Sequence, residues 1–220
     1  MPRCQGKFER DVRARGFRYV AGVDEVGRGC IFGPVVAAAV ILSPEQPIRG
    51  LRDSKMLSPE DRETLAVRIK QRAICWAVGA ADAYEIDRIN IYQASRVAMK
   101  RAVEKLTPVP DFLLVDAIQV DLPIEQEAMI HGDGRSQCIA AASIVAKTHR
   151  DEMMRQWDEV FPFLGLARHK GYGTEEHLDA IRQHGPTLLH RFSFEPVRAA
   201  CQYELWTGYD QIEVAVEAHA

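Results

Sequence analysis

The chain has few features of a secreted, membrane-bound or disulfide-stabilised protein. Its five cysteines are odd in number, scattered over 220 residues, and show no Cys-x-x-Cys spacing. This pattern predicts reduced thiols and argues against a zinc site built from cysteines. The N-terminus has no apolar signal region, and the longest apolar run, Val35 to Leu42, is too short to span a membrane. We therefore expect a cytoplasmic protein with no membrane contact.

An excess of positive charge is also missing. The formal net charge of -3 at pH 7 does not fit a protein that coats nucleic acid nonspecifically. A nuclease stays possible, because a cluster of metal-binding acids would offset basic residues elsewhere. The hydrophobic content of 47% supports a large core and argues against disorder. The length suits one large domain, or a domain with a small appendage.

The most informative segment covers residues 21–29, Ala-Gly-Val-Asp-Glu-Val-Gly-Arg-Gly. Asp24 and Glu25 end an apolar run that is typical of a strand, and acids in that position can hold a divalent metal. The Gly27-Arg28-Gly29 turn follows, where glycines let backbone N–H groups approach a ligand. The arginine offers a fork of donors suited to phosphate. Together these residues suggest phosphodiester chemistry on a nucleic acid or nucleotide.

Two simpler interpretations compete with that hypothesis. Acids and glycines after a strand often form nothing more than a solvated turn. The glycines, together with Gly33, also approximate the dinucleotide-binding pattern G-x-G-x-x-G. However, the third glycine comes one residue late, and Pro34 and a β-branched run follow it in place of a helix.

Strands and helices are expected to alternate along much of the chain. Strands are predicted at residues 17–26, 35–42, 73–81, 112–115 and 127–131. A helix is predicted to open at Ser58-Pro59, with serine as its cap, and further helices to cover 91–106, 137–160 and 174–184. Residues 161–174 are expected to form a loop. This alternation predicts an α/β domain.

Acids recur where three of these strands end. Asp24 and Glu25 close the first strand, Asp116 closes the fourth, and Asp133 follows the fifth. A lone aspartate in such a place is usually a cap or a turn residue. Ligand sites in α/β sheets lie beyond strand ends, so acids at three ends favour a shared metal site.

Several further blocks of sequence occur in a fixed order. They are residues 24–29 with 33–35, 53–55 with 57–58, 114–116, 132–133 with 139–147 and 150–151, and 170–174 with 190–194 and 196–197. In these blocks the chain resembles ribonuclease HII, the type 2 ribonuclease H, over about residues 17–198. The departures are mild, such as Ala117 where glycine is frequent, and they spare the acids.

The resemblance implies a ribonuclease H-like α/β fold: a mixed five-stranded sheet flanked by helices, with a helical C-terminal extension. A catalytic domain is expected over residues 1–160 and the extension over residues 161–220. The implied activity is endonucleolytic hydrolysis of the RNA strand of RNA–DNA hybrids. It includes incision 5′ of single ribonucleotides embedded in duplex DNA, as in ribonucleotide excision repair, leaving 3′-hydroxyl and 5′-phosphate ends. We expect a monomer whose partners are these nucleic acids.

The resemblance also assigns residues. The catalytic and metal-binding acids are Asp24, Glu25, Asp116 and Asp133, which would hold two Mg²⁺ or Mn²⁺ ions once substrate is bound. The substrate-binding candidates are Gly27, Arg28, Gly29, Lys55, Ser143, Lys147 and Tyr172. The tyrosine would stack on the sugar 3′ of the ribonucleotide. Arg150 and Lys170 are further basic candidates.

For these residues simpler roles remain open. Tyr172 could be a packed loop aromatic, Ser143 a core serine, and the lysines merely solvated side chains. Asp151 is expected to be structural, not a fifth ligand. A noncatalytic hybrid-binding module is the rival function, and it predicts the loss of one or more of the acids.

Overall fold

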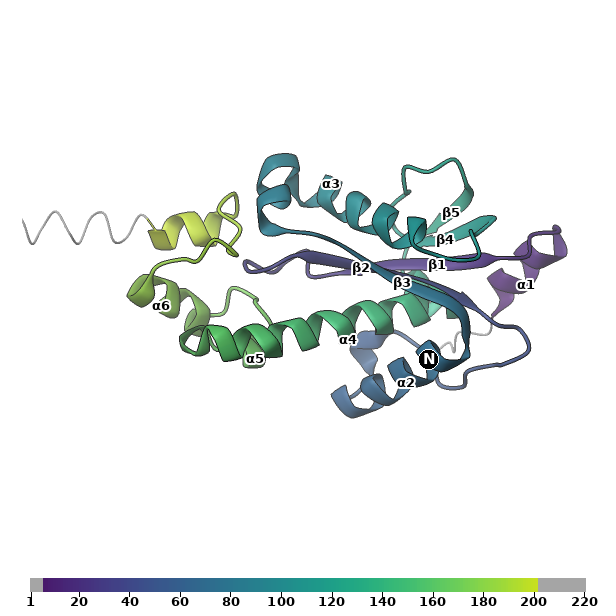
Figure 1. Cartoon of the computed structure of the whole chain (residues 1–220), viewed down its shortest axis with the longest axis horizontal. Helices are drawn as coiled ribbons and strands as arrows, with labels where there is room; N and C mark the ends of the chain where they lie inside the picture. The colour runs from purple at the N-terminus through teal and green to yellow at the C-terminus, as the bar shows by residue number, and fades with distance from the viewer. Residues whose placement is uncertain (1–5, 202–220) are drawn as a thin grey trace, which may run out of the picture. The chain divides into compact units, whose positions relative to one another are not determined.

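The computed structural model describes residues 6–201, and their centre is one mixed five-stranded sheet with the order β3-β2-β1-β4-β5 (Figure 1). The strands are β1 Val20–Val26, β2 Val35–Leu42, β3 Ala73–Ala81, β4 Phe112–Asp116 and β5 Glu125–Met129. The mixed sheet expected from the resemblance is confirmed. The residues from Tyr209 to the C-terminus, where the sequence predicts a frayed tail, lie outside the described residues.

The sheet brings the ends of three strands to one edge. β1 runs antiparallel to β2 but parallel to β4, and β4 runs parallel to β5. The register pairs Val23 with Val115, so the next residue of each strand, Asp24 or Asp116, comes at the same level. Parallel strands present their carboxyl ends together, and this edge therefore gathers acids from separate parts of the sequence.

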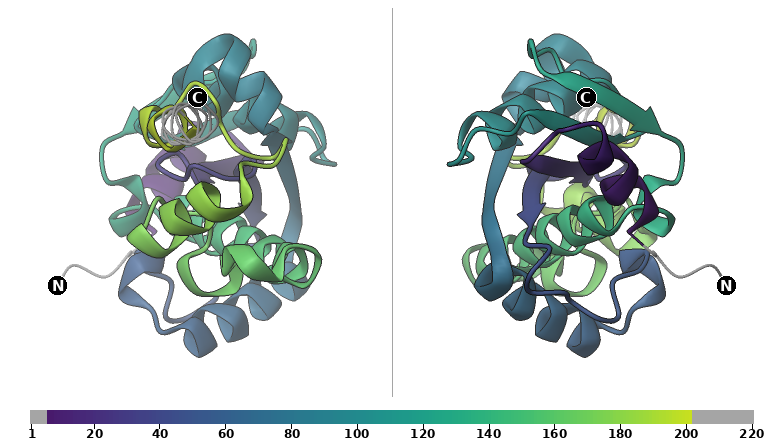
Figure 2. Two further views of the ribbon diagram at one scale, coloured as in Figure 1. Left: turned by 90° about the vertical axis from the view of Figure 1, so that its left-hand side faces the viewer. Right: turned by 90° about the vertical axis from the view of Figure 1, so that its right-hand side faces the viewer.

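Helices cover both faces of the sheet. The helices that lie wholly within the described residues are α1 Lys7–Ala14, α2 Pro59–Arg72, α3 Ala83–Glu104, α4 Gln137–Val160, α5 Leu166–His169 and α6 Glu175–His184. Figures 1 and 2 agree that the part of α3 after Asn90 lies on one face, while α2 and the first half of α4 lie on the other. α4 packs closely, because a Cβ on Gly22 would stand 2.0 Å from the backbone carbon of Cys138.

The structure divides into two compact units. The first contains the sheet and comprises the described residues up to Arg28, Val35–Ala81 and Ile91–Glu152; the second comprises Gly29–Pro34, Asp82–Asn90 and the described residues from Met153. The expected division into residues 1–160 and 161–220 stays a prediction.

Most predicted elements are confirmed, and the differences have local causes. The first strand begins at Val20, not at residue 17, because the backbone amides of Arg18 and Tyr19 donate to the Asp111 carboxylate instead of a neighbouring strand. The fifth strand is Glu125–Met129, two residues earlier than expected. The predicted loop over 161–174 contains α5 and a short 3-10 turn.

Two helical segments were not predicted. α1 precedes the sheet, and α3 begins at Ala83, eight residues before the predicted start at Ile91. The early start of α3 is stabilised by a reciprocal cap, in which Glu85 N donates to Asp82 and Asp82 N donates to Glu85. Asn90, with φ 65 and ψ 162, interrupts the helix where the predicted part begins.

Candidate active site

Asp24 and Glu25 lie near the carboxyl end of β1, where Asp24 is buried and Glu25 is partly buried. Asp24 is 6% exposed, and one of its carboxylate oxygens accepts the backbone N–H of Glu25 at 2.8 Å. Ser143, on the α4 face that covers the sheet, is hydrogen-bonded to the Asp24 carboxylate. The Ser143 hydroxyl also lies 2.9 Å from the hydroxyl of Ser54. A chain of hydrogen-bonded side chains therefore holds Asp24 from the α4 side.

Asp116 and Asp133 come from the ends of the next two strands. Asp116 closes β4, and its Oδ1 accepts the backbone N–H of Gly132 at 2.8 Å. Asp133 is buried in the 3-10 turn Gly132–Gly134 after β5. Ala117 and His131, which flank these two turns, have φ values of 56 and 55, a left-handed conformation that costs a non-glycine residue energy. Tight turns thus direct both carboxylates.

The electrostatics show that the four acids share one site. Burial raises the pKa of Asp24 well above the usual carboxyl range, and the charges of Glu25 and Asp116 raise it further. Burial also raises the pKa of Glu25, opposed by Arg28, and that of Asp133, where Asp53 and Asp116 add to the effect. The structure therefore brings together all four acids named from the sequence, and their roles stay predictions.

This donor set fits a hard divalent cation. All four side chains offer carboxylate oxygens, the ligands that Mg²⁺ and Mn²⁺ take. One oxygen of Glu25 is buried without a hydrogen-bond partner, which is costly unless something else compensates it. A cation here would relieve both the orphaned oxygen and the mutual repulsion that raises the pKa values.

The side chains are nevertheless not preset around an ion. Within residues 6–201, no three Asp, Glu, His or Cys side chains are arranged to ligate one metal. The carboxylates are instead held apart by donors of the protein, such as Gly132 N on Asp116 and Arg28 on Glu25. This arrangement agrees with carboxylates that repel one another and must turn to meet an ion, and the prediction that substrate completes the site remains open.

The first half of the Gly-Arg-Gly turn has an intramolecular role. Arg28 forms an ion pair with Glu25 at 3.2 Å. Gly27 has φ 92, and a Cβ there would stand 2.3 Å from the Nε atom of Arg150. A side chain at position 27 would therefore be strained and would collide with the guanidinium group of Arg150, a residue that is only 1% exposed. Arg150, considered above as a phosphate contact, is thus part of the interior.

The two candidate lysines have different surroundings. Lys55 is exposed, and its charge lowers the pKa of Asp133, so its ammonium group faces the acids. Lys147 is paired with Asp151 at 2.6 Å, and Asp151 is also 3.6 Å from Arg62. Asp151 is therefore a structural partner of two cations, in agreement with the role expected for it.

Gly29 and Tyr172 belong to the second unit, where a backbone bridge joins their segments. Cys30 pairs with Tyr172 in an antiparallel bridge, and Ile31 N donates to Gly171 O at 2.9 Å. A Cβ on Gly29 would lie 3.9 Å from the ring of Tyr172, which is 45% exposed. Tyr172 is therefore not a buried packing aromatic, and its ring presents a surface to solvent.

Two residues of the site, Asp53 and Ser54, are not predicted from the sequence. Asp53 adds a fifth negative charge near Asp133, and the hydroxyl of Ser54 is hydrogen-bonded to the hydroxyl of Ser143. Both stand in the short turn Ser54–Met56 or at its cap. The Asp-Ser-Lys block was visible in the sequence, but a block of this kind does not show that it packs against α4.

Similarity to known proteins shows the family to which the chain belongs. A family model described as Ribonuclease HII matches residues 21–197. The chain belongs to the ribonuclease HII family. The Ribonuclease HII of Solibacter usitatus is 63% identical over 203 residues, which cover 92% of this chain and 89% of that protein. Membership makes the chain an enzyme, an endoribonuclease of the ribonuclease H type. The dinucleotide-binding pattern would need a helix after Gly33, and the structure has the strand β2 there.

Solved structures share the fold of this ribonuclease HII chain. The ribonuclease H2 of Pyrococcus horikoshii OT3 superposes with a TM-score of 0.71 at 23% identity, covering 83% of this chain and 97% of that one. Bst-RNase HIII in complex with Mn²⁺ superposes with a TM-score of 0.67 at 21% identity, covering 84% and 70%. At these identities the likeness concerns the fold. Among the helices of residues 6–201, none has the length and apolarity needed to cross a membrane.

Proposed function

We propose that this enzyme hydrolyses the RNA strand of RNA–DNA hybrids and cuts 5′ of single ribonucleotides embedded in duplex DNA. The observation that carries the proposal is the convergence of Asp24, Glu25, Asp116 and Asp133 at one edge of the sheet, with raised pKa values for three of them. Family membership supports the ribonuclease chemistry. The rival noncatalytic module predicts a missing acid, and none of the four is missing.

The acids would hold two Mg²⁺ or Mn²⁺ ions, which supply an activated water and neutralise charge on the leaving 3′-oxygen. The chain's own residues prepare this arrangement. Ser143 orients Asp24, and Arg28 lowers the pKa of Glu25 against the larger, opposing effect of burial. Lys55, whose charge lowers the pKa of Asp133, would bind a phosphate at the rim of the acid cluster.

Recognition of RNA is assigned to the Gly27-Arg28-Gly29 turn and to Tyr172. The turn offers backbone groups to a 2′-hydroxyl, which can both donate and accept a hydrogen bond. The exposed ring of Tyr172 offers a stacking surface for the next sugar. Lys147 is a weaker phosphate ligand than the sequence suggested, because Asp151 already pairs with it.

The test is cleavage of a DNA duplex that carries one ribonucleotide, with and without Mg²⁺. We expect incision 5′ of the ribonucleotide only when the divalent ion is present, with 3′-hydroxyl and 5′-phosphate ends. These ends follow because a water, not the neighbouring 2′-hydroxyl, is the proposed nucleophile. A 2′,3′-cyclic phosphate product, or equal cleavage in the presence of a chelator, would refute the proposal.

A further inference from the structure

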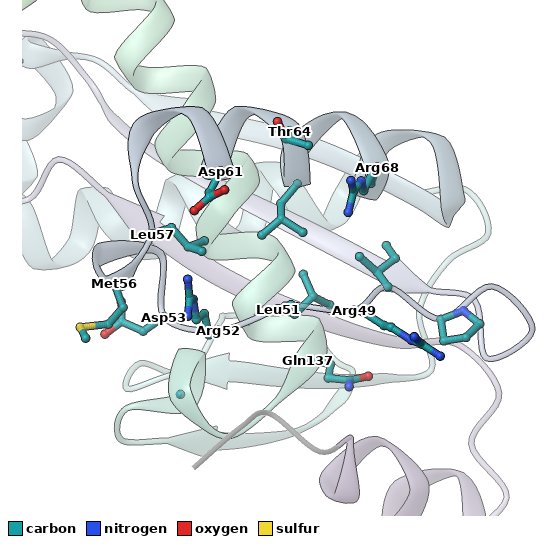
Figure 3. A pocket seen from close by; sticks show the side chains of 15 residues that line it. Arg49, Leu51, Arg52, Asp53, Met56, Leu57, Asp61, Thr64, Arg68 and Gln137 are labelled. Carbon is teal, nitrogen blue, oxygen red and sulfur yellow. The ribbon is translucent and has the colours of Figure 1, made fainter. Parts of the chain in front are cut away.

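A large cavity in the first unit adjoins the acid cluster. It has a volume of about 1090 Å³ and lies between the segment Pro47–Asp53, α2 and the start of α4 (Figure 3). Its floor is apolar, with buried Ile48, Leu51 and Leu65. The proposed nuclease chemistry involves none of these residues, so the cavity needs a separate explanation.

Three arginines line this cavity from two sides. Arg49 and Arg52 come from the segment before the short turn, and Arg68 comes from α2 on the opposite side (Figure 3). All three are exposed. Within residues 6–201 no hydrogen bond or ion pair is formed by any of the three. Their guanidinium groups therefore have all their donors free for a ligand.

Two neighbouring arginines, unlike the three of the cavity, form hydrogen bonds with backbone carbonyls. Arg62, also on α2, donates to the backbone carbonyls of Ser54 and Leu57. Arg72 donates to the carbonyl of Pro47 at 3.4 Å. These two arginines connect α2 to the preceding segment through hydrogen bonds, whereas the three cavity arginines form no such connection within residues 6–201. Two carboxylates, Asp53 and Asp61, also line the cavity, so the three arginines leave an excess of positive charge.

The cavity is connected to the acid cluster through Asp53 and Gly134. The charge of Asp53 raises the pKa of Asp133, which places the two carboxylates near one another. Gly134, another lining residue, directly follows Asp133 in the chain. A negatively charged polymer with one phosphate at the acids would therefore meet the arginines with another of its phosphates.

We propose that this cavity binds the phosphodiester backbone of the nucleic acid at a distance from the cleaved bond. Guanidinium groups match phosphate oxygens in pairs. The inference rests on the proposed function, because it supposes that the acids engage the same nucleic acid. It adds a second anchoring point, which fixes the position of the duplex on the enzyme.

The test compares salt dependence of binding in two charge-matched variants. The cavity variant is Arg49→Gln, Arg52→Gln and Arg68→Gln together. The control is Arg15→Gln, Arg18→Gln and Lys100→Gln, which removes three cations that do not line the cavity. Of these, Arg15 and Arg18 precede β1, at the end of the strand opposite to Asp24. Each protein is titrated with a fluorescent RNA–DNA hybrid in a chelator, so that no cleavage occurs, over a series of salt concentrations.

The slope of log K against log salt is negative, and each lost phosphate contact reduces its magnitude by about 0.9. The magnitude of the slope for the cavity variant should therefore be smaller than that of the wild type by up to about 2.7. We expect at least a tenfold weaker affinity at low salt, and a control slope like the wild type. An unchanged slope in the cavity variant, or an equal loss in the control, would overturn the inference. Thermal melts of both variants show that they are folded.

A further arm separates the nucleic acid backbone from a small phosphate ligand. Inorganic phosphate and a mononucleotide are titrated into the wild type and the cavity variant by calorimetry. Tight wild-type binding of either one, with an unchanged hybrid slope, would assign the cavity to a small ligand and overturn the proposal. Cleavage of the single-ribonucleotide substrate by the wild type is measured in parallel, because its failure would refute the proposed function and not this site alone.

Discussion

The Nε2 atom of His177 lies 3.2 Å from the Nε2 atom of His190, and both rings are fully buried. The backbone N–H of Thr187 donates to Nδ1 of His190, so the His190 proton is on Nε2. Nδ1 of His177 faces the Tyr172 carbonyl at 2.9 Å and must carry a proton to donate. His190 therefore donates to His177, and the network is complete only when both rings are neutral.

This network predicts that acid destabilises the protein. Burial lowers the pKa of both His177 and His190 to about 4, below the ordinary value of 6.5. The unfolded chain then binds more protons than the folded one between these values. Stability from the neutral pair is complete above pH 6.5 and is lost as the pH falls toward 4, by up to about 1.4 kcal/mol per pH unit for each histidine.

The measurement is chemical unfolding from pH 4.5 to 7.5 for the wild type and for His177→Asn. Asparagine keeps a donor for the Tyr172 carbonyl but does not titrate, so the variant should show the shallower dependence on pH. Carboxyl groups titrate in the same range in both proteins, and the difference between them isolates the histidine. Equal slopes would show that the pair is not held neutral.

The acid cluster predicts that Asp24→Asn separates activity from stability. Asp24 is buried beside two other carboxylates, so removal of its charge relieves repulsion and burial cost. We expect cleavage to fall by on the order of 10²–10³-fold or more, as when a group that stabilises transition-state charge is removed. The melting temperature should equal or exceed that of the wild type.

The matched control for Asp24 is Asp121→Asn. The Asp121 side chain is 82% exposed, and it lies 4.0 Å from the ammonium group of Lys100. A surface ion pair of this length contributes little to activity or to the melting temperature. Activity and melting temperature should both stay at the wild-type level in this variant. Near-normal cleavage by a folded Asp24→Asn protein would end the assignment of Asp24 as a metal ligand.

The sequence predicted elements best where one local signal dominates. The continuous apolar run Val35–Leu42 is buried along its whole length and forms β2 as expected. Ser58 caps α2 by accepting the N–H of Asp61. β5 was misplaced because it is a half-exposed edge strand, and its start is set by the pairing of Phe112 with Glu125, not by its own pattern.

For the site, the sequence identified the acids but not what supports them. Strand ends with acids are visible in a one-dimensional pattern, and parallel pairing then brings them together. The contact between Ser54 and Ser143 spans 89 residues, and no local pattern shows which loop packs on which helix. The same limitation hid the free arginines of the cavity, because exposed arginines are common and their lack of partners is a property of the fold.

The turn after Asp116 predicts a stabilising substitution, Ala117→Gly. Ala117 has φ 56, a conformation that costs an L-residue about 1–2 kcal/mol. Glycine removes this cost but adds about 0.4–1 kcal/mol of freedom to the unfolded chain. The free energy of unfolding should therefore rise by up to about 1.6 kcal/mol in urea titrations. The control Ala66→Gly lies within helix α2 and should lose about 1 kcal/mol or more. A similar loss in both variants would show that Ala117 is not strained.

Tyr172 predicts a change in substrate preference. A stacking contact to the sugar 3′ of the ribonucleotide is closest when that sugar lacks a 2′-hydroxyl, as it does at an RNA–DNA junction. Stacking on an aromatic ring is worth roughly 1–3 kcal/mol. Tyr172→Ala should therefore lose on the order of ten- to a hundredfold in cleavage efficiency on a single embedded ribonucleotide. The loss on a continuous hybrid, which has no such junction, should be smaller. Metal dependence should stay the same, because Tyr172 is not proposed as a ligand, and Tyr172→Phe should keep the wild-type preference. The ratio of efficiencies on the two substrates is the deciding measurement: if Tyr172→Ala leaves that ratio unchanged, the ring does not recognise the junction.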